Sequence, residues 1–188
     1  MGQQGWLAHV VAGRAHGAAA DQLDTREICL ARDVLAAHDP LADFVLAMQG
    51  LGSGALVLQG SASQQARWLP GVVSGTTLAA FALSEPQAGS DVAAMQCWAE
   101  PVEGGYRLHG EKTWISNGGI AGFYVLFARL ASGPLPEGGA WPRGTRDIAA
   151  FVVPADAPGL EVARRLDVLA PHPLAHLTLD GVRVQADA

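Results

Sequence analysis

The spacing of hydrophobic and polar positions changes near residue 76 and divides the chain into a helix-forming part and a strand-forming part. Before that point, apolar residues recur at helical spacing in three runs. Residues that commonly cap a helix or begin its first turn precede these runs: Asp24 with Glu27, Asp39 with Pro40, and Ser61 or Ser63. The pattern predicts helices over residues 28–37, 41–58 and 63–73, with Pro70 ending or kinking the third.

After residue 76, short apolar or alternating runs are separated by Gly, Pro and Asp, which is typical of strands. These runs cover residues 77–84, 105–110, 123–130, 148–153 and 177–184. Residues 103–105 resemble a hairpin turn, and the Pro- and Gly-rich residues 132–147 are expected to form an exposed loop. Because strands do not alternate with helices, a Rossmann sheet is not expected. The predicted fold class is α+β, with an N-terminal helical domain over residues 1–76 and an antiparallel β-barrel domain over residues 77–188.

The composition is that of a globular chain with little charge. Of 188 residues, 49% are hydrophobic and 16% are charged, and the formal net charge is −6. A negative chain is a poor candidate for nonspecific nucleic-acid binding, which needs clustered Lys and Arg. The start of the chain lacks the pattern of a signal peptide, and no apolar run is expected to approach the length needed to cross a bilayer, so a soluble protein is predicted. Cys29 and Cys97 form neither a metal-ligand nor a disulfide pattern, which favours a reducing, cytoplasmic compartment.

Three patterns resemble binding sites, and each also has a structural explanation. Residues 105–113 nearly spell a phosphate-binding P-loop, but Glu111 interrupts it and no helical pattern follows, so a turn between strands is expected. The three glycines of residues 50–54 permit either close packing of helices or close approach of a ligand. His172 and His176 are spaced like metal ligands on a helix, but neighbouring prolines disfavour a helix and no metal site is predicted.

Two short segments combine polar groups with small residues. In residues 82–91, ALSEPQAGSD, Glu85 and Asp91 could form a carboxylate pair for acid–base chemistry. Loop carboxylates more often accept hydrogen bonds from backbone N–H groups, and that structural role is favoured. Residues 114–119, WISNGG, fit either a core Trp before a turn or a site for a flat aromatic ligand. In the second case the ligand would lie on Trp114, with Ser116 at its polar edge.

ALSEPQAGSDVAA and EKTWISNGG together resemble the two signature motifs of the acyl-CoA dehydrogenase family. Weaker similarities occur in the order that the family has. They are QQARWLPGVVSG before the first motif, and FYVLFAR and FVVPADAPGL after the second, so the resemblance extends from about residue 25. It implies an N-terminal helical domain, a middle β-barrel and a C-terminal helical bundle. The chain resembles a shortened first part plus the barrel, and the bundle is expected to be absent from it.

The resemblance also implies FAD as cofactor and assigns residues to it by motif position. Backbone groups and the Ser84 hydroxyl would hydrogen-bond the heteroatoms of the isoalloxazine ring, and donors there stabilise the charge of the reduced flavin. Gly89 would allow close approach of the backbone, and Ser90 would contact the FAD pyrophosphate or the acyl-CoA substrate. Asp91 is expected to fix its loop. The expected cofactor-binding residues are Phe81, Leu83, Ser84, Gly89, Ser90, Trp114, Ile115 and Ser116.

The reaction that the resemblance implies is α,β-desaturation of an acyl-CoA thioester, with hydride transfer to flavin and electron transfer to an electron-transfer flavoprotein. The family's glutamate base comes from the C-terminal domain, so no catalytic residue is assigned in this chain. Two alternatives stay open: a non-catalytic FAD- or CoA-binding subunit that needs a partner chain, and a flavin oxidase or monooxygenase-like relative. A homo-oligomer or a complex with a partner subunit is expected, without nucleic acid or membrane.

Overall fold

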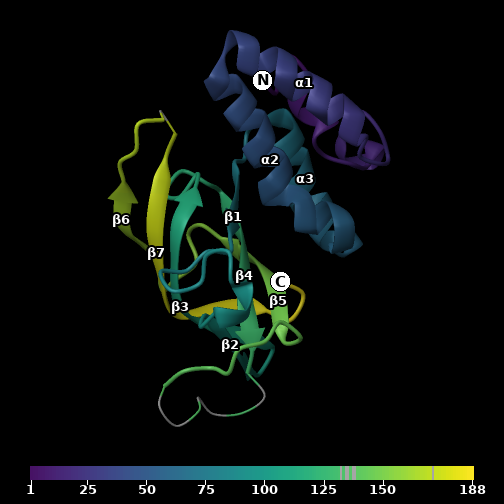
Figure 1. Cartoon of the computed structure of the whole chain (residues 1–188). Coiled ribbons are helices and arrows are strands. Elements are labelled where there is room, and N and C mark those ends of the chain that lie inside the picture. The colour runs from purple at the N-terminus through teal and green to yellow at the C-terminus, as the bar shows by residue number, and fades with distance from the viewer. Residues whose placement is uncertain (132, 134–135, 137–138, 171) are drawn as a thin grey trace.

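Three helices lie above one curved sheet in the computed structural model, which describes residues 1–188 except 132, 134–135, 137–138 and 171 (Figure 1). The helices are α1 (Thr25–His38), α2 (Pro40–Gln59) and α3 (Ala62–Ser74), with short 3-10 turns η1 (Trp6–His9), η2 (Arg14–His16) and η3 (Val92–Ala94). The strands are β1 (Ala79–Ala82), β2 (Trp98–Val102), β3 (Gly105–Ser116), β4 (Phe123–Leu130), β5 (Ile148–Pro154), β6 (Leu160–Leu166) and β7 (Leu174–Gln185).

The helix starts agree with the capping residues in the sequence. The side chains of Asp24, Asp39 and Ser61 each accept hydrogen bonds from backbone N–H groups of the following first turn. Only Ser61 forms the reciprocal capping box, with Gln64. Pro70 lies inside α3, which continues to Ser74, so Pro70 does not end the helix.

The sheet is mixed, and the prediction of an antiparallel barrel is wrong in that respect. Its order is β1-β4-β2-β3-β7-β6, with β5 beside β4 (Figure 1). Strand β4 runs parallel to both β1 and β2, whereas the other pairs are antiparallel. In the sequence, the β2–β3 hairpin lies between β1 and β4. After β3 the chain crosses over, and β4 enters the sheet between β1 and β2 and runs in the same direction as both. The predicted turn joins β2 to β3, with Gly104 at φ 78°.

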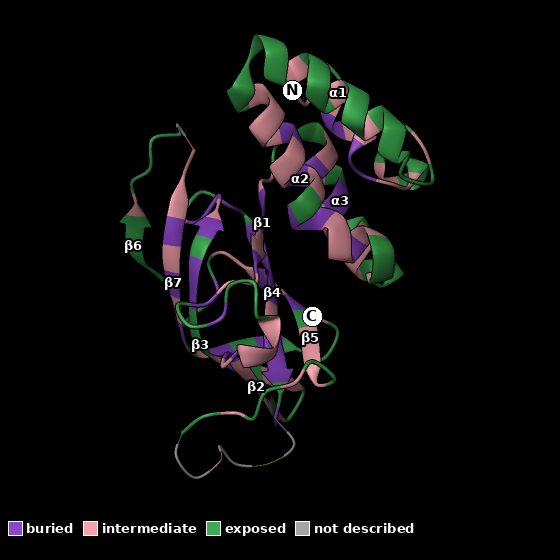
Figure 2. Cartoon of the chain, in the orientation of Figure 1, coloured by how far each residue is buried: buried purple, intermediate pink, exposed green. Residues whose placement is uncertain are grey.

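The core lies on both sides of β4, whose residues are mostly buried (Figure 2). One side packs into the interior of the curved sheet, around Leu108, Leu126 and Leu177. The other side packs under α2 and α3, where Phe123 contacts Trp68 at 4.7 Å between ring centroids. Helix α1 has no buried residue and lies outside this core. The helical layer is therefore attached to the sheet through α2 and α3.

The glycine-rich part of α2 packs against a strand rather than against another helix. A Cβ atom on Gly52 would lie 2.8 Å from the Cβ and carbonyl carbon of Ala79, the first residue of β1. No atom lies within 4 Å of a Cβ built on Gly54. Of the two interpretations of these glycines, close packing therefore holds for Gly52, which packs against β1.

Helix α2 is also long and apolar enough to cross a bilayer, judged by length and composition alone. The expectation that no run reaches this length is therefore wrong. The core helix of a soluble protein meets the same criteria, so this is weak evidence for a membrane span.

Candidate functional site

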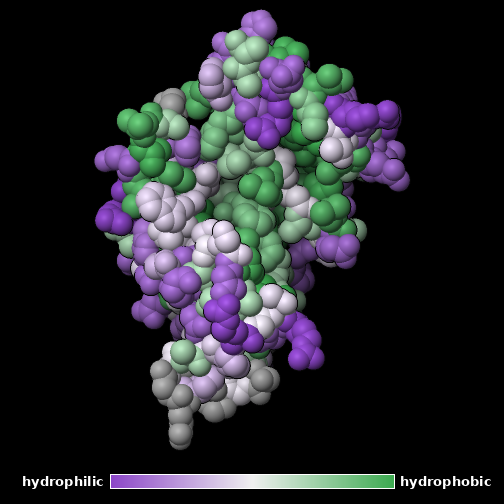
Figure 3. All heavy atoms as spheres, viewed as in Figure 1, coloured by the Kyte–Doolittle hydropathy of each residue, from purple (hydrophilic) through white to green (hydrophobic). Residues whose placement is uncertain are grey.

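A cavity of about 150 Å³ lies where α2, the end of β1 and the end of β3 meet. Five of the eight expected cofactor-binding residues line it. The lining residues are Met48, Leu51, Ala79, Ala80, Phe81, Ser84, Trp114, Ile115 and Ser116. On the face shown in Figure 3, hydrophobic residues gather in the hollow between the helices and the sheet. The two sequence motifs therefore meet at one apolar cavity with hydroxyl groups in its wall.

The other three expected residues lie outside this lining. The Leu83 side chain packs against the sheet interior. Gly89 and Ser90 are exposed, and no atom lies within 4 Å of a Cβ built on Gly89. The structure thus brings together the five predicted residues that line the cavity. Gly89 and Ser90 lie apart from them, on the surface loop after β1.

Hydrogen bonds from the second motif hold the first motif and the start of β1 in place. The Thr113 N–H donates to the Ser84 carbonyl at 2.9 Å, and the Asn117 side-chain amide donates to the Ala79 carbonyl at 2.9 Å. Among the described residues, no hydrogen bond from the Ser84 N–H is found. Ser84 therefore offers both a backbone donor and a hydroxyl at the cavity wall.

Trp114 has a backbone conformation that a bulky side chain rarely adopts. Its φ is 58° and it is 60% exposed, between the buried Thr113 and Ile115. The pairing of β3 with β7 shifts register between Lys112 and Ile115, which breaks the in–out alternation of the strand. A non-glycine residue in the left-handed region costs about 1–3 kcal/mol, and such strain concentrates at functional sites. The indole is thus held outward, beside the cavity.

We expect Trp114→Gly to be more stable than Trp114→Ala by about 1 kcal/mol, because glycine adopts positive φ without the Cβ penalty. Urea denaturation of the two variants, compared with wild type, measures the difference. At most exposed strand positions the order is reversed, since glycine has the larger unfolded-state entropy. An alanine variant as stable as the glycine variant would show that residue 114 is not strained.

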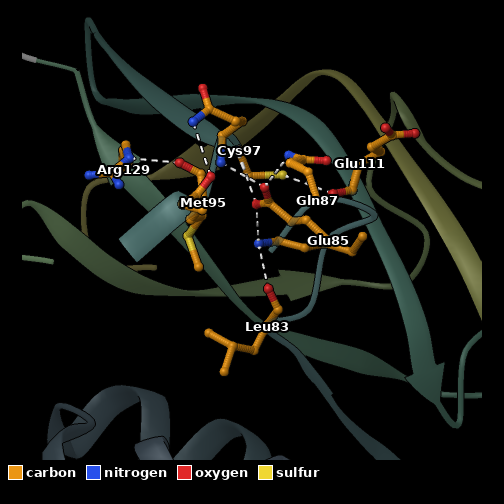
Figure 4. Close-up of polar contacts among 10 residues, drawn as sticks. Leu83, Glu85, Gln87, Met95, Cys97, Glu111 and Arg129 are labelled. Atoms are coloured by element: carbon orange, nitrogen blue, oxygen red, sulfur yellow. Dashed lines mark hydrogen bonds and ion pairs between the residues drawn. The ribbon is translucent and has the colours of Figure 1, made fainter. Parts of the chain in front are cut away.

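Glu85 is buried and does not pair with Asp91. Its carboxylate accepts from the Lys112 ammonium at 2.8 Å and from the backbone N–H groups of Gln96 and Cys97 at 2.6 and 3.0 Å (Figure 4). Asp91 instead forms an exposed ion pair with Arg143. Glu85 thus has the structural role favoured from sequence, whereas the Asp91 side chain makes no capping hydrogen bond to the turn that follows it. Neither side chain lines the cavity. Burial raises the pKa of the neighbouring Cys97 thiol to about 12, so the thiol is neutral and unreactive near pH 7.

His172, His176 and the near P-loop each have a structural setting in the described part of the chain. His172 stacks on Phe44 at 4.2 Å between ring centroids, and His176 lies 2.9 Å from the carboxylate of Glu111. In the part of the chain that the structure describes, no group of three or more metal-ligating side chains occurs. The near P-loop forms most of β3, which ends at Ser116 without a following helix.

Sequence reasoning did not single out four residues that support the site: Lys112, Asn117, Tyr124 and Arg129. The Tyr124 hydroxyl accepts from the Gly119 N–H at 3.0 Å and so holds the turn after β3, and burial raises the pKa of Tyr124. No local pattern pointed to Lys112, because each motif contains two charged residues: Glu85 and Asp91 in the first, Glu111 and Lys112 in the second.

Sequence comparison agrees with this arrangement. A family model described as the acyl-CoA dehydrogenase middle domain matches residues 80–182, and one described as the N-terminal domain matches residues 1–76. The chain belongs to the acyl-CoA dehydrogenase family. The division of the chain at residue 76 into two domains stays a prediction.

Individual relatives extend well beyond this chain. The chain is 38% identical over 114 residues to the 2-methylacyl-CoA dehydrogenase of Solanum tuberosum, which covers 61% of this chain and 26% of that protein. It is 34% identical over 166 residues to a very long-chain specific acyl-CoA dehydrogenase of Macaca fascicularis, covering 82% of this chain and 24% of that protein. A glutaryl-CoA dehydrogenase from Mycobacterium smegmatis, solved in complex with FADH2, superposes with a TM-score of 0.83 at 29% identity, covering 100% of this chain and 45% of that one. The chain thus spans about a quarter of the curated relatives and under half of this solved structure.

Proposed function

We propose that this chain is part of an FAD-dependent acyl-CoA dehydrogenase that desaturates an acyl-CoA thioester between its α and β carbons. The observation that supports it most directly is the cavity lined both by Ser84, whose N–H has no acceptor among the described residues, and by the strained, exposed Trp114. Family membership and a solved relative in complex with FADH2 support the same proposal.

The residues at the cavity suit an isoalloxazine ring. A flat, largely apolar ring with polar heteroatoms at one edge needs an aromatic surface and a few placed donors. Trp114 supplies the surface, whereas the Ser84 N–H and the hydroxyls of Ser84 and Ser116 supply the donors. Bound FAD would supply a hydride acceptor at this position.

The chain's own residues would then orient the ring and exclude water. Met48 and Leu51 of α2 form the apolar wall opposite the end of β1, where water would otherwise reach the reacting atoms. The donors at Ser84 are fixed by the sheet and would stabilise negative charge on a reduced ring without rearrangement. Ser90, on the exposed loop, remains the proposed contact to the FAD pyrophosphate or the acyl-CoA.

We propose that the base that removes the α-proton lies outside these residues. The cavity is lined by apolar, aromatic and hydroxyl side chains and by no Asp, Glu or His. Glu85, the nearest carboxylate in sequence, is buried and occupied by four donors. An electron-transfer flavoprotein as electron acceptor, a homo-oligomer or a partner subunit, and a cytoplasmic location remain proposals.

The test uses the full protein that contains this chain. We expect it to purify with FAD and to lose flavin absorbance when a saturated acyl-CoA is added without oxygen. Isovaleryl-CoA and palmitoyl-CoA are suitable probes, because relatives are named for branched short-chain and very long-chain substrates. Rapid oxygen consumption during turnover would indicate an oxidase, and a protein that binds no flavin would refute the proposal.

A further inference from the structure

The two sequence motifs are joined by an ion pair inside the sheet. The side chains of Glu85 and Lys112 are both 0% exposed, and the ammonium lies 2.8 Å from the carboxylate. The Gln87 side-chain amide and the backbone N–H groups of Gln96 and Cys97 supply three further donors to the carboxylate. Figure 4 shows dashed lines converging on the carboxylate of Glu85, which lies in the loop that follows β1. The pair is therefore fully desolvated and its carboxylate fully hydrogen-bonded.

Lys112 makes a second contact that points toward the cavity. Its ammonium also donates to the Leu83 carbonyl at 3.0 Å (Figure 4). The Leu83–Ser84 peptide is trans, so its N–H points opposite to its carbonyl. Because the carbonyl is held toward the buried ammonium, the Ser84 N–H is directed away from the sheet interior. The next carbonyl, that of Ser84, is held by the Thr113 N–H.

We propose that Lys112 is a positioning residue of the flavin site: it fixes the Leu83–Ser84 peptide so that the Ser84 N–H faces the cavity as a donor to the bound ring. Glu85 serves as the counter-ion of the Lys112 ammonium in this interior. This inference rests on the proposed function. It explains why each motif contributes one charge to the buried pair and why the Ser84 N–H has no acceptor among the described residues.

Geometry distinguishes this role from stabilisation alone. A buried ion pair often contributes little net stability compared with apolar replacements of similar size. The ammonium, by contrast, acts on one backbone carbonyl, and that carbonyl belongs to the peptide whose N–H lies at the cavity. Loss of the ammonium should therefore change how the ring is bound even when the fold survives.

The variant that tests this is the double replacement Glu85→Gln with Lys112→Met in the full protein. Lys112→Met alone would leave an uncompensated buried carboxylate and is expected to impair folding. The double variant removes both charges and frees the Leu83–Ser84 peptide. We expect its FAD dissociation constant to rise about tenfold, as for one lost hydrogen bond, with shifted flavin absorbance bands and a lower flavin reduction potential.

Gln87→Ala is the matched control. It removes one donor from Glu85 but leaves the contact between Lys112 and the Leu83 carbonyl intact. Its FAD affinity, absorbance bands and reduction potential should equal those of wild type. If any loss of a hydrogen bond to Glu85 disturbed the flavin site, Gln87→Ala would instead change the FAD affinity, the absorbance bands and the reduction potential.

The outcomes separate the two proposals. A wild-type protein without flavin refutes the proposed function. A wild-type flavoprotein whose folded double variant keeps the wild-type affinity, spectrum and potential refutes the positioning role. Should the double variant not fold, hydrogen exchange of the wild-type segment around Ser84 decides: FAD should slow exchange of the Ser84 amide, and unchanged exchange would refute the role.

Discussion

Replacing Arg129 with Met is expected to lower the free energy of unfolding by about 3–5 kcal/mol, because one buried and three partly buried acceptors would lose their donor together. Arg129 lies on β4 and is 1% exposed. Its guanidinium donates at 2.8 Å to the carbonyls of Ala93, Met95 and Gly144 and at 2.9 Å to the carboxylate of Asp147. It thus ties the loop after β1 and the loop before β5 to the central strand. Denaturation by urea, followed by tryptophan fluorescence, measures the loss.

Arg143→Met is the control for this prediction. Arg143 contacts Asp91 in the same two loops, but its side chain is 69% exposed. An exposed ion pair contributes little, so a change within about 0.5 kcal/mol is expected. If both variants lost a similar free energy of unfolding, the buried hydrogen bonds of Arg129 would contribute no more to stability than the exposed ion pair of Arg143, and the prediction would be wrong.

The sequence predicted the helices well because their signals are local. Asp24, Asp39 and Ser61 lie next to the N–H groups that they cap, so three or four residues contain the information. Strand β6 was not predicted because nearly all of its residues are at least partly exposed and show no alternation. The parallel pairing of β4 was missed because turn residues reveal only hairpins between consecutive strands.

The site was predictable only as far as the motif resemblance reached. It named five of the nine residues that line the cavity, but not Met48, Leu51, Ala79 or Ala80, and not the contacts that hold the lining in place. Lys112 and Glu85 are 27 positions apart, and a Glu-Lys-Thr segment in a strand gives no sign that its lysine is buried. The same is true of Asn117, whose amide reaches back 38 positions to Ala79. Such pairs depend on the register of the folded sheet, which one sequence does not encode locally.

Gly52→Ala is expected to destabilise the protein by about 2–3 kcal/mol, the upper part of the range of about 1–3 kcal/mol for overpacking a well-packed contact. The new Cβ would lie 2.8–2.9 Å from three atoms of Ala79, two of them backbone. Ala79 cannot easily yield, because its N–H donates to the Gln49 side chain at 2.8 Å and its carbonyl accepts from Asn117 at 2.9 Å. Helix α2 would have to move away from β1. Chemical denaturation and FAD titration of the purified variant measure the two consequences.

Gly54→Ala, two residues further along the same helix, should have the opposite sign. Its Cβ meets no atom within 4 Å, so alanine brings only its better helix propensity, about 0.5–1 kcal/mol of added stability. The displacement of α2 in Gly52→Ala would also move Met48 and Leu51 away from Phe81 and Ser84, which should weaken FAD binding. Gly54→Ala should leave FAD affinity unchanged. If both variants gained stability, the close approach of α2 to β1 would not be a constraint on the fold, and the cavity wall would not depend on it.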